Sequence, residues 1–359
     1  MHILHVVGAR PNFMKAAPVL AALAGCKGVR QTLIHTGQHY DANMSDVFFQ
    51  QLDMPAPDLD LGVGSGSHAR QTAEVITRFE PVVIERKPSL VLVYGDVNST
   101  VAVAIVCSKL LIPVGHVEAG LRSRDRAMPE EINRVITDQL SDLLFTPSPD
   151  GDENLLHEGI DPGKIHRVGN VMIDTLVRLL PRAASHLPAG LPERYLLVTL
   201  HRPSNVDDLP WLSSLLTGLA ELSRELAMAV VFPLHPRTRQ RLSGLDLPAL
   251  SGNDFLLLDP QPYLSFLALQ QAAAMVITDS GGVQEETSYL GVPCFTMREN
   301  TERPVTVSMG TNRLIGRDMG RLRTEVNRMR DGEKKQTLPI PLWDGHAAER
   351  IARVVTEWG

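Results

Sequence analysis

Three carboxylates stand at positions suited to proton transfer. Asp96 follows the apolar run Leu90–Tyr94, Glu118 follows the run VGHV, and Glu130 lies in the first turn of a helix that begins at Pro129. Because ligands bind at the carboxyl ends of parallel strands, we expect these side chains to gather at one sheet edge. Clustered like charges raise the pKa of at least one carboxyl, as a general acid or base near neutrality requires.

Each carboxylate also has a plain structural reading. Asp96 alone suits a turn or a helix cap, and Glu130 alone suits a helix in which it pairs with Arg134 four residues later. A capped helix explains Glu131 and Arg134 fully. It does not explain three carboxylates at one edge, so we favour the proton-transfer interpretation.

Two basic residues follow the first strand-like run. Arg10 and Lys15 come just after Gly8, where Pro11 indicates the start of a helix. A helix N-terminus already favours anions, so the two cations suit a phosphate as well as plain solvent exposure. The chain has no Walker A sequence, and no Gly-x-Gly-x-x-Gly follows this run.

The strongest local signal for a phosphate is the segment DSGGVQEE, which follows the run MVIT and opens a helix. Gly281 and Gly282 let a phosphate approach the backbone N–H groups, and Ser280 adds a hydroxyl donor. Glu286 lies about one and a half turns into that helix, where a carboxylate can reach two ribose hydroxyls. The alternative is a helix start loosened by glycine, and we favour the phosphate site.

Two histidines in the second half also follow strand-like runs. His201, next to Arg202, follows YLLVTL, and His235 follows VVFPL. A lone histidine at such a place is more often structural, but two histidines beside an arginine resemble a polyanion site. Arg303 adds a further cation, and no spacing of residues suggests a metal centre.

Short apolar runs alternate with helical stretches along the whole chain. This pattern is typical of α/β proteins with parallel sheets covered on both faces, and it predicts two Rossmann-like, doubly wound domains with a hinge between them. The proline-rich stretch 181–192 is the expected linker, giving domains 1–180 and 190–344, with a C-terminal helix over 345–359 that packs back on one of them. The predicted strands are Ile3–Val7, Thr32–Ile34, Leu90–Tyr94, Val114–Val117, Leu143–Thr146, Leu196–Thr199, Ala229–Phe232, Phe255–Leu258 and Met275–Thr278.

Composition excludes several classes of protein. The 359 residues are 43% hydrophobic and 21% charged, which is ordinary for a globular protein. The net charge of −6 and 5% aromatic residues argue against nucleic-acid binding. Three distant cysteines offer no disulfide framework, and neither a signal peptide nor a membrane span is evident, so we expect a cytoplasmic protein.

Eight segments in order resemble the non-hydrolysing UDP-N-acetylglucosamine 2-epimerase family, over residues 2 to about 315. They are GARPNFMK, YGDVNST, GHVEAGLRS, MPEEINR, HR, DPQPYLSF, TDSGGVQEE and TERP. The resemblance implies the GT-B architecture, a UDP-sugar substrate with UDP as leaving group, no cofactor and no metal, and a homodimer.

The resemblance also implies roles for residues at the matching positions. Asp96, Glu118 and Glu130 would be the catalytic carboxylates, and His201 is counted with them. The uridine and diphosphate would be held by Gln261, Phe266, Ser280, Gly281, Gly282 and Glu286, and the diphosphate would be neutralised by Arg10, Lys15, His201 and Arg303. His235 is added to the substrate-binding residues because of the two-histidine pattern described above. The implied reaction inverts C2 of the sugar by eliminating UDP to a 2-acetamidoglucal and adding it back, for surface glycan biosynthesis.

Other readings remain open at this stage. The text HTGQHYDANMSDVFF is similar to a sub-branch that acts on UDP-diacetamido-uronic acids, and Pro203 stands where many bacterial members have a second arginine after HR. A hydrolysing 2-epimerase and a GT-B glycosyltransferase would use a similar cleft. The carboxylate trio favours the isomerase, since a transferase normally needs one base.

Overall fold

The computed structural model describes residues 1–38, 51–242, 255–332 and 335–358, and the chain divides into two compact units. Unit 1 comprises Met1–Arg178 and Ile340–Gly359, and unit 2 comprises Leu179–Pro339. Most of the segment GQHYDANMSDVFF lies outside the described residues. The units are described separately below.

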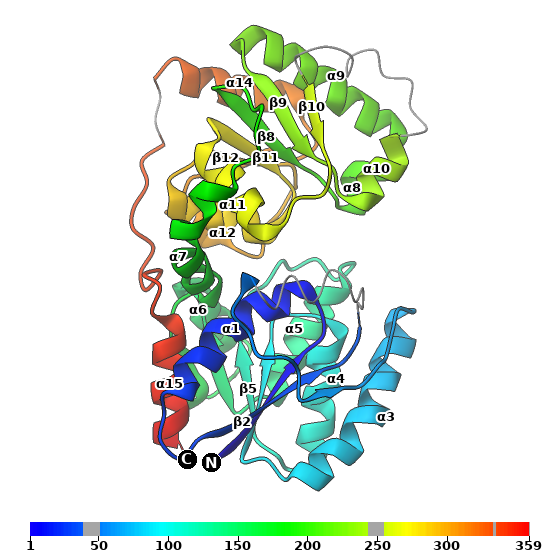
Figure 1. Ribbon diagram of the computed structural model, residues 1–359, viewed down its shortest axis with the longest axis vertical. Helices are drawn as coiled ribbons and strands as arrows, with labels where there is room; N and C mark the ends of the chain where they lie inside the picture. Colours follow the sequence, from blue (N-terminus) through cyan, green and yellow to red (C-terminus); the bar gives the residue numbers. More distant parts are fainter. Residues whose placement is uncertain (39–50, 243–254, 333–334, 359) are drawn as a thin grey trace. The chain divides into compact units, whose positions relative to one another are not determined.

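Unit 1 contains a parallel sheet of seven strands in the order β3-β2-β1-β4-β5-β6-β7 (Figure 1). The strand order reverses between β1 and β4, which is the usual ligand-binding point of a doubly wound sheet. The strands are β1 (His2–Val7), β2 (Arg30–His35), β3 (Leu59–Asp60), β4 (Leu90–Tyr94), β5 (Val114–Val117), β6 (Leu143–Thr146) and β7 (Ile165–Arg167).

Helices connect these strands and pack on the sheet, and α3 buries one face only. In α3, Gln71, Val75, Phe79 and Val83 are buried at a spacing of four residues, as an amphipathic helix on a sheet requires. Each fully buried apolar side chain of this kind contributes about 1.5–3 kcal/mol. The helices are α1 (Arg10–Ala24), α3 (His68–Arg86), α4 (Asn98–Lys109), α5 (Pro129–Leu140), α6 (Pro149–His157), α7 (Val171–Ala183) and α15 (Ala347–Trp358), with a 3-10 turn η1 (Pro162–Lys164).

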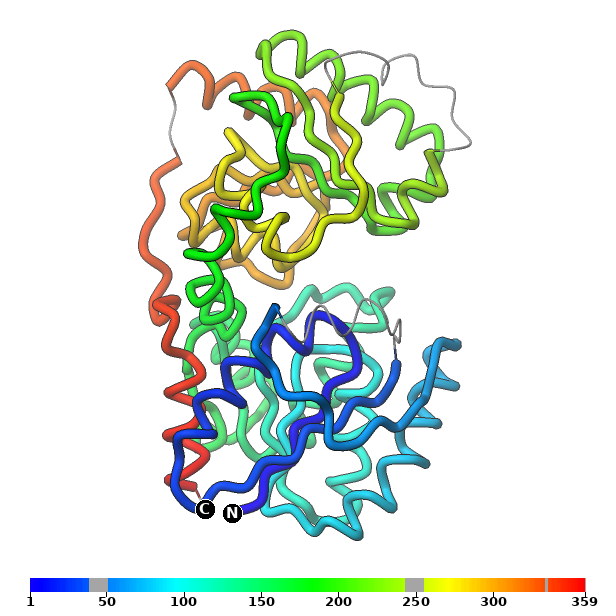
Figure 2. Tube along the Cα trace, viewed as in Figure 1, coloured from blue at the N-terminus to red at the C-terminus, as the bar shows by residue number. Residues whose placement is uncertain are grey.

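The C-terminal helix α15 belongs to unit 1, where it packs beside α1 (Figure 2). The Asp174 carboxylate of α7 accepts the backbone N–H groups of Ala347 and Ala348 at 3.1 and 2.6 Å. A carboxylate at a helix N-terminus satisfies free N–H groups and offsets the helix dipole. The buried stripe of α15, with Ile351 and Val355, covers apolar surface of the same unit.

Unit 2 contains a parallel sheet of six strands in the order β10-β9-β8-β11-β12-β13. Its strand order reverses between β8 and β11. The strands are β8 (Tyr195–Thr199), β9 (Ala229–Pro233), β10 (Phe255–Leu258), β11 (Met275–Thr278), β12 (Cys294–Thr296) and β13 (Asn312–Leu314).

Both faces of this sheet are covered, and β8 shows how. Leu196 and Val198 join a core cluster with residues of α9 and α14, whereas Tyr195 and Leu197 join a cluster with residues of α11 and α12. This alternation is the period of two that a strand dictates. The helices are α8 (Pro203–Val206), α9 (Leu209–Leu226), α10 (Pro236–Leu242), α11 (Tyr263–Ala272), α12 (Gly281–Leu290), α13 (Pro304–Ser308) and α14 (Met319–Arg330), with a 3-10 turn η2 (Ala184–His186).

The predicted α/β class with two doubly wound parallel sheets is confirmed. The nine predicted strands all form, and the strands that the sequence missed are β3, β7, β12 and β13, which have only two or three residues. The first part of the stretch 181–192, which was expected as a linker, is helical. In the structure α7 continues through Pro181 to Ala183, and η2 follows it.

Candidate active site

The carboxyl edge of the unit 1 sheet carries the residues predicted for catalysis. Asp96 follows β4 and Glu118 follows β5, while Arg10 and Lys15 lie on α1, which follows β1. Glu130 is the second residue of α5 and is half-buried. Arg10 is exposed at the first position of α1. Four of these residues therefore come from the ends of three neighbouring strands, β1, β4 and β5, as the sequence suggested.

Lys15 and Glu118 form a buried ion pair between the Lys15 Nζ and Glu118 Oε2 atoms. Glu118 has a backbone φ of 74°, the left-handed region that costs a non-glycine residue about 1 kcal/mol or more. Backbone strain of this kind accumulates at functional sites. The strain turns the chain directly after β5, where the Glu118 and Ala119 N–H groups both donate to the Phe145 carbonyl at 3.1 and 3.0 Å.

Gly95 brings the end of β4 against this pair. Its φ is 62°, and a Cβ atom at this position would lie 2.6 Å from Lys15 Nζ and 3.2 Å from Glu118 Oε2. Only glycine allows both the backbone conformation and this close approach. The end of β4, one residue before Asp96, therefore lies against the Lys15–Glu118 pair.

Asp96 has its own cation. Arg134 Nη1 lies 2.5 Å from Asp96 Oδ2, and Asn133 donates its side-chain amide to the Asp96 carbonyl at 2.8 Å. The sequence suggested Glu130 as the partner of Arg134, whereas Arg134 forms ion pairs with Asp96 and with Glu131. Two of the three carboxylates therefore face cations, Asp96 with Arg134 and Glu118 with Lys15.

A buried histidine supports the same edge. His116 of β5 is fully buried, with Nδ1 2.6 Å from Asp138 Oδ1 and Nε2 2.8 Å from the Gly95 carbonyl. Arg122 Nη1 lies 2.7 Å from the other oxygen of Asp138. Burial alone would raise the pKa of Asp138, but His116 and Arg122 hold it below its usual value. Sequence reasoning missed these residues, although His116 was visible as a polar residue inside an apolar run.

In unit 2, His201 and Asp279 meet at the reversal point of the sheet. His201 follows β8 and Asp279 follows β11, and His201 Nδ1 lies 2.9 Å from Asp279 Oδ1. The ring of His235, which is exposed after β9, lies with its centroid 5.6 Å from the His201 ring. His235 Nδ1 accepts the Arg237 N–H at 3.2 Å, at the start of α10.

The predicted phosphate segment begins α12 as expected. Ser280 is its N-cap residue, and Ser280, Gly281 and Gly282 are half-buried. A Cβ atom on Gly281 would lie 2.5 Å from Arg303 Nη1 and 2.8 Å from Glu302 Oε1. Gly281 therefore lets the guanidinium of Arg303 lie against the first turn of α12.

Arg303 belongs to a buried cluster of charges. It forms ion pairs with Glu285 and Glu302, and Glu302 also pairs with Arg298 at 2.7 Å. Arg202 Nη2 approaches Glu302 at 3.8 Å. The cluster contains three arginines and two glutamates, so it retains an excess of positive charge next to the helix start.

The uridine-binding predictions fall on α11, the preceding loop and α12. Gln261 is half-buried and donates to the Asp259 carbonyl at 2.8 Å, and Phe266 packs against the apolar cluster of α11 and α12. The Glu286 carboxylate is buried, where it accepts Tyr263 Oη–H at 2.8 Å and Gln270 Nε2–H at 2.5 Å. Burial raises the pKa of Glu286, and these two hydrogen bonds oppose the rise.

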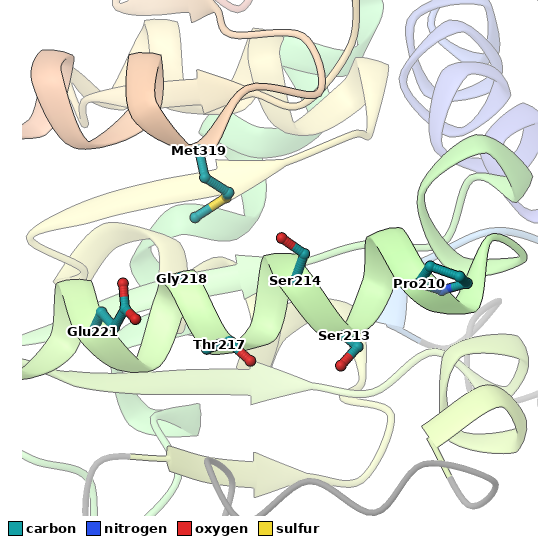
Figure 3. A pocket seen from close by; sticks show the side chains of 7 residues that line it. All are labelled: Pro210, Ser213, Ser214, Thr217, Gly218, Glu221 and Met319. Atoms are coloured by element: carbon teal, nitrogen blue, oxygen red, sulfur yellow. The ribbon is translucent and has the colours of Figure 1, made fainter.

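Three further features were sought among the described residues: a group of metal ligands, a membrane-spanning helix and a pocket. No three His, Cys, Asp or Glu side chains among them form a group suited to a metal ion. None of the described helices is long and apolar enough to cross a membrane. One pocket of unit 2 contains none of the predicted site residues (Figure 3); it is lined by Pro210, Ser213, Ser214, Thr217, Gly218, Glu221 and Met319.

Comparison with known proteins gives full-length matches. A family model described as UDP-N-acetylglucosamine 2-epimerase matches residues 21–356. The chain is 41% identical to the UDP-N-acetylglucosamine 2-epimerase of Methanocaldococcus jannaschii over 365 residues, covering 99% of each chain. It is 44% identical over 323 residues to the UDP-2,3-diacetamido-2,3-dideoxy-D-glucuronate 2-epimerase of Pseudomonas aeruginosa, covering 89% of this chain and 90% of that one.

A solved structure matches the whole chain as well. It is the Methanocaldococcus jannaschii UDP-GlcNAc 2-epimerase in complex with UDP-GlcNAc and UDP, with a TM-score of 0.91, 41% identity and complete coverage of both chains. The GT-B-like class expected from the sequence is therefore confirmed.

Proposed function

Because this chain belongs to the UDP-N-acetylglucosamine 2-epimerase family, we propose that it inverts C2 of UDP-GlcNAc and so interconverts it with UDP-ManNAc. The observation that carries the proposal is the carboxyl edge of unit 1. There a strained, buried Glu118 pairs with Lys15 against Gly95, the residue before Asp96. Such a group of acids with a cation suits proton transfer next to a leaving anion.

The chemistry that fits these residues is elimination and re-addition. A carboxylate removes the C2 proton, the C2–H electron pair forms the C1=C2 bond, and the electron pair of the C1–O bond leaves with UDP. The enzyme-bound 2-acetamidoglucal then accepts a proton at the other face of C2, and UDP forms the C1–O bond again. Atoms and electrons balance without a redox cofactor or water as a reactant, so the enzyme is an isomerase of the non-hydrolysing kind.

We assign the residues to three tasks. Asp96, Glu118 and Glu130 transfer protons, and Arg10, Lys15, His201 and Arg303 stabilise the diphosphate that leaves. Ser280, Gly281 and Gly282 bring α12 N–H groups to a phosphate, which their half-buried position at the helix start supports. Uridine contacts are assigned to Gln261, Phe266 and Glu286, and His235 is assigned to the diphosphate together with His201.

A second candidate substrate is supported by one specific observation. The Pseudomonas aeruginosa relative, 44% identical to this chain, is named for UDP-2,3-diacetamido-2,3-dideoxy-D-glucuronate. The C2 chemistry would be the same, and only the groups that meet C3 and C6 of the sugar would differ.

Proton NMR of the purified enzyme in D₂O with one UDP-sugar at a time tests these proposals. We expect UDP-ManNAc to form from UDP-GlcNAc, with solvent deuterium at C2. Free ManNAc plus UDP would identify a hydrolysing enzyme, and turnover of the diacetamido-uronate alone would identify the second substrate. An epimer that keeps all its C2 protium would exclude the elimination mechanism.

We further propose that the enzyme is a cytoplasmic homodimer that supplies a UDP-sugar for surface glycans. The family resemblance supports these assignments, and the three free cysteines, of which two are buried, suit a reducing compartment. Light scattering measures the mass of the particle in solution. Loss of a surface glycan on deletion of the gene, and its return with the active enzyme, tests the role in glycan synthesis.

A further inference from the structure

One fully buried carboxylate of unit 2 has no part in the roles assigned above. Asp279 follows β11 at the point where the strand order of the sheet reverses, beside the end of β8. Its Oδ1 atom lies 2.9 Å from His201 Nδ1. Its Oδ2 atom accepts the Arg202 N–H at 2.9 Å and the Asn205 side-chain amide at 3.0 Å. The His201 backbone N–H lies 3.1 Å from both oxygens. Oδ1 is therefore the oxygen that faces the imidazole ring, and Oδ2 is the one that also holds Arg202 and Asn205 of the loop after β8.

We propose that Asp279 and His201 form a carboxylate–imidazole pair, in which Asp279 is a positioning residue for His201. An ionised carboxylate only accepts hydrogen bonds, so the ring nitrogen that faces it, Nδ1, must carry a proton. Nε2 is then the nitrogen that exchanges a proton or a hydrogen bond with substrate. The inference rests on the proposed function, which brings His201 to the diphosphate.

The surroundings keep Asp279 charged. Burial alone would raise the pKa of Asp279, but hydrogen bonds from His201, Asn205 and the Arg202 N–H hold it below its usual value. The other groups that face the pair are the His235 ring, 5.6 Å from the His201 ring, and Arg202, whose Nε donates to the Asp279 carbonyl at 3.2 Å. The His201 side chain is 38% exposed, whereas the Asp279 side chain is fully enclosed.

The pair would assist the departure of UDP. As the C1–O bond breaks, its electron pair moves to the β-phosphate oxygen, and the protonated His201 ring donates Nε2–H to that oxygen. The Asp279 carboxylate stabilises the positive ring, and the same proton remains with Nε2 or returns to it when UDP adds back. No atom is lost in the cycle. Because Asp279 fixes the orientation of the His201 ring, the ring need not turn as the C1–O bond breaks.

Asp279→Asn is the informative variant because only Oδ1 faces the ring, while Oδ2 accepts the Arg202 N–H and the Asn205 amide and can keep the His201 backbone N–H that both oxygens share. An asparagine of the same shape keeps an oxygen for Arg202 and Asn205, and it presents an NH₂ donor to the ring. His201 must then carry its proton on Nε2 or lose the contact. We expect kcat to fall by about 10²- to 10⁴-fold, as loss of a properly oriented acid or base does, while the Kd for UDP changes by less than about threefold.

Asn205→Ala is the matched control for a merely structural role. It removes a hydrogen bond from the same carboxylate without touching the oxygen that faces the ring. It should lower Tm at least as much as Asp279→Asn and yet reduce kcat by only a few fold. If Asn205→Ala reduces kcat as much as Asp279→Asn, the loop and not the pair explains the effect.

A double-mutant cycle then tests the coupling. Asp279→Asn should cost little in kcat when His201 is already alanine, because the residue it positions is gone. An equal loss of kcat with and without the His201 ring would overturn the proposal.

Nitrogen-15 NMR of histidine-labelled wild-type protein measures which nitrogen of the His201 ring carries the proton. This measurement requires no turnover, and it does not depend on whether a variant folds. The neutral His201 ring should carry its proton on Nδ1, and Asp279→Asn should move that proton to Nε2. A neutral wild-type ring with its proton on Nε2 would overturn the inference, whatever the activity. The expected proton position in an enzyme that turns over no UDP-sugar would instead contradict only the proposed function.

Discussion

Arg134 Nη1 lies 2.5 Å from Asp96 Oδ2, so a carboxylate at the end of β4 is held by an arginine from the helix α5. The side chain of Arg134 is 2% exposed, and its Nη2 atom lies 2.8 Å from Glu131 Oε2. One guanidinium therefore joins two carboxylates. This arrangement fixes the direction of Asp96 while leaving 28% of the Asp96 side chain accessible.

We predict that Arg134→Met destabilises the protein by about 3–5 kcal/mol, the usual cost of leaving a buried charge without its partner. The uncompensated group is Glu131, whose side chain is 5% exposed. Urea unfolding of wild type and variant measures the difference. Burial alone would raise the pKa of Glu131, but the backbone N–H of Ser123 and the guanidinium of Arg134 hold that pKa below its usual value.

The double variant Arg134→Met/Glu131→Gln separates stability from function. It removes the buried charge as well as its partner, so we expect it to recover part of the lost free energy of unfolding. We expect kcat to be low in the single variant and equally low in the double variant, because Asp96 lacks its cation in both. Recovery of kcat together with stability would show that Arg134 serves only the fold.

We predict that Glu130→Gln lowers kcat by about 10²- to 10⁴-fold with little change in the Kd for UDP, as expected of a proton-transfer group. The variant is informative because Glu130 is half-buried on the first turn of α5, so its effect on folding should be small. Asp96→Asn and Glu118→Gln should also lower kcat. Glu118→Gln removes the charged partner of Lys15, and Asp96→Asn removes one of the two carboxylates that pair with Arg134, so the stability of both variants must be measured beside kcat.

Ser280→Ala provides the opposite profile. Removal of a hydroxyl donor beside the start of α12 should weaken UDP binding, which calorimetry measures. If Glu130→Gln weakens UDP binding as much as Ser280→Ala does, Glu130 belongs to the binding residues. A loss of kcat smaller than about tenfold would also remove Glu130 from the proton-transfer group.

The sequence predicted the positions of these side chains because strand ends are visible in it. Apolar runs of four or five residues mark β4 and β5, and the polar residue after each run must lie at the carboxyl edge of a parallel sheet. The same rule applied to the run MVIT points to Asp279, the first residue of the segment DSGGVQEE that predicts a phosphate site. Its position at a strand end was therefore visible in the sequence, whereas its contact with His201 was not.

The ion-pair partners of these side chains were not predictable from the sequence. They lie far away along the chain, and the spacing rules that apply to neighbouring residues say nothing about such distant pairs. Lys15 and Glu118 are 103 residues apart in the chain, and Arg134 and Asp96 are 38 apart. An i, i+4 rule favoured Glu130 for Arg134, but burial of the guanidinium against the end of β4 determined the pairing. Strands of two or three residues were missed for a related reason, since pairing with a neighbouring strand defines them more than their own residue types do.

Acid should destabilise unit 2 through Glu302. Burial alone would raise the pKa of this carboxyl, but Arg303 and Arg298 hold it well below its usual range. A carboxyl whose pKa is lowered on folding contributes stability that is fully present above its unfolded pKa of about 4.5 and is lost as the pH falls towards its folded pKa. We therefore predict that the free energy of unfolding declines from about pH 5 to pH 3.

Glu302→Gln tests this source of acid sensitivity. The variant should be less stable at neutral pH, because Arg298 and Arg303 lose a charged partner, and its stability should change less between about pH 5 and pH 3. Urea unfolding at several pH values measures both effects. An acid dependence as steep as that of wild type would assign the effect to other carboxyls with lowered pKa values, such as Asp279 and Asp138.

Gly95→Ala should damage both the fold and the proposed site, whereas Gly28→Ala should lower stability alone. Both glycines have a positive φ, of 62° and 79°, so alanine at either position carries about 1–2 kcal/mol of backbone strain. Around Gly28 nothing lies within 4 Å of a Cβ atom, whereas at Gly95 the Cβ would lie 2.6 Å from Lys15 Nζ. The lysine must then move away, which disturbs its buried pair with Glu118 and adds to the loss of stability.

We expect Gly28→Ala to lower stability by the strain alone and to keep wild-type kcat. We expect Gly95→Ala to lose more stability and most of its kcat. Equal effects of the two variants on urea unfolding and on kcat would show that the close approach of Gly95 to Lys15 has no role in the site.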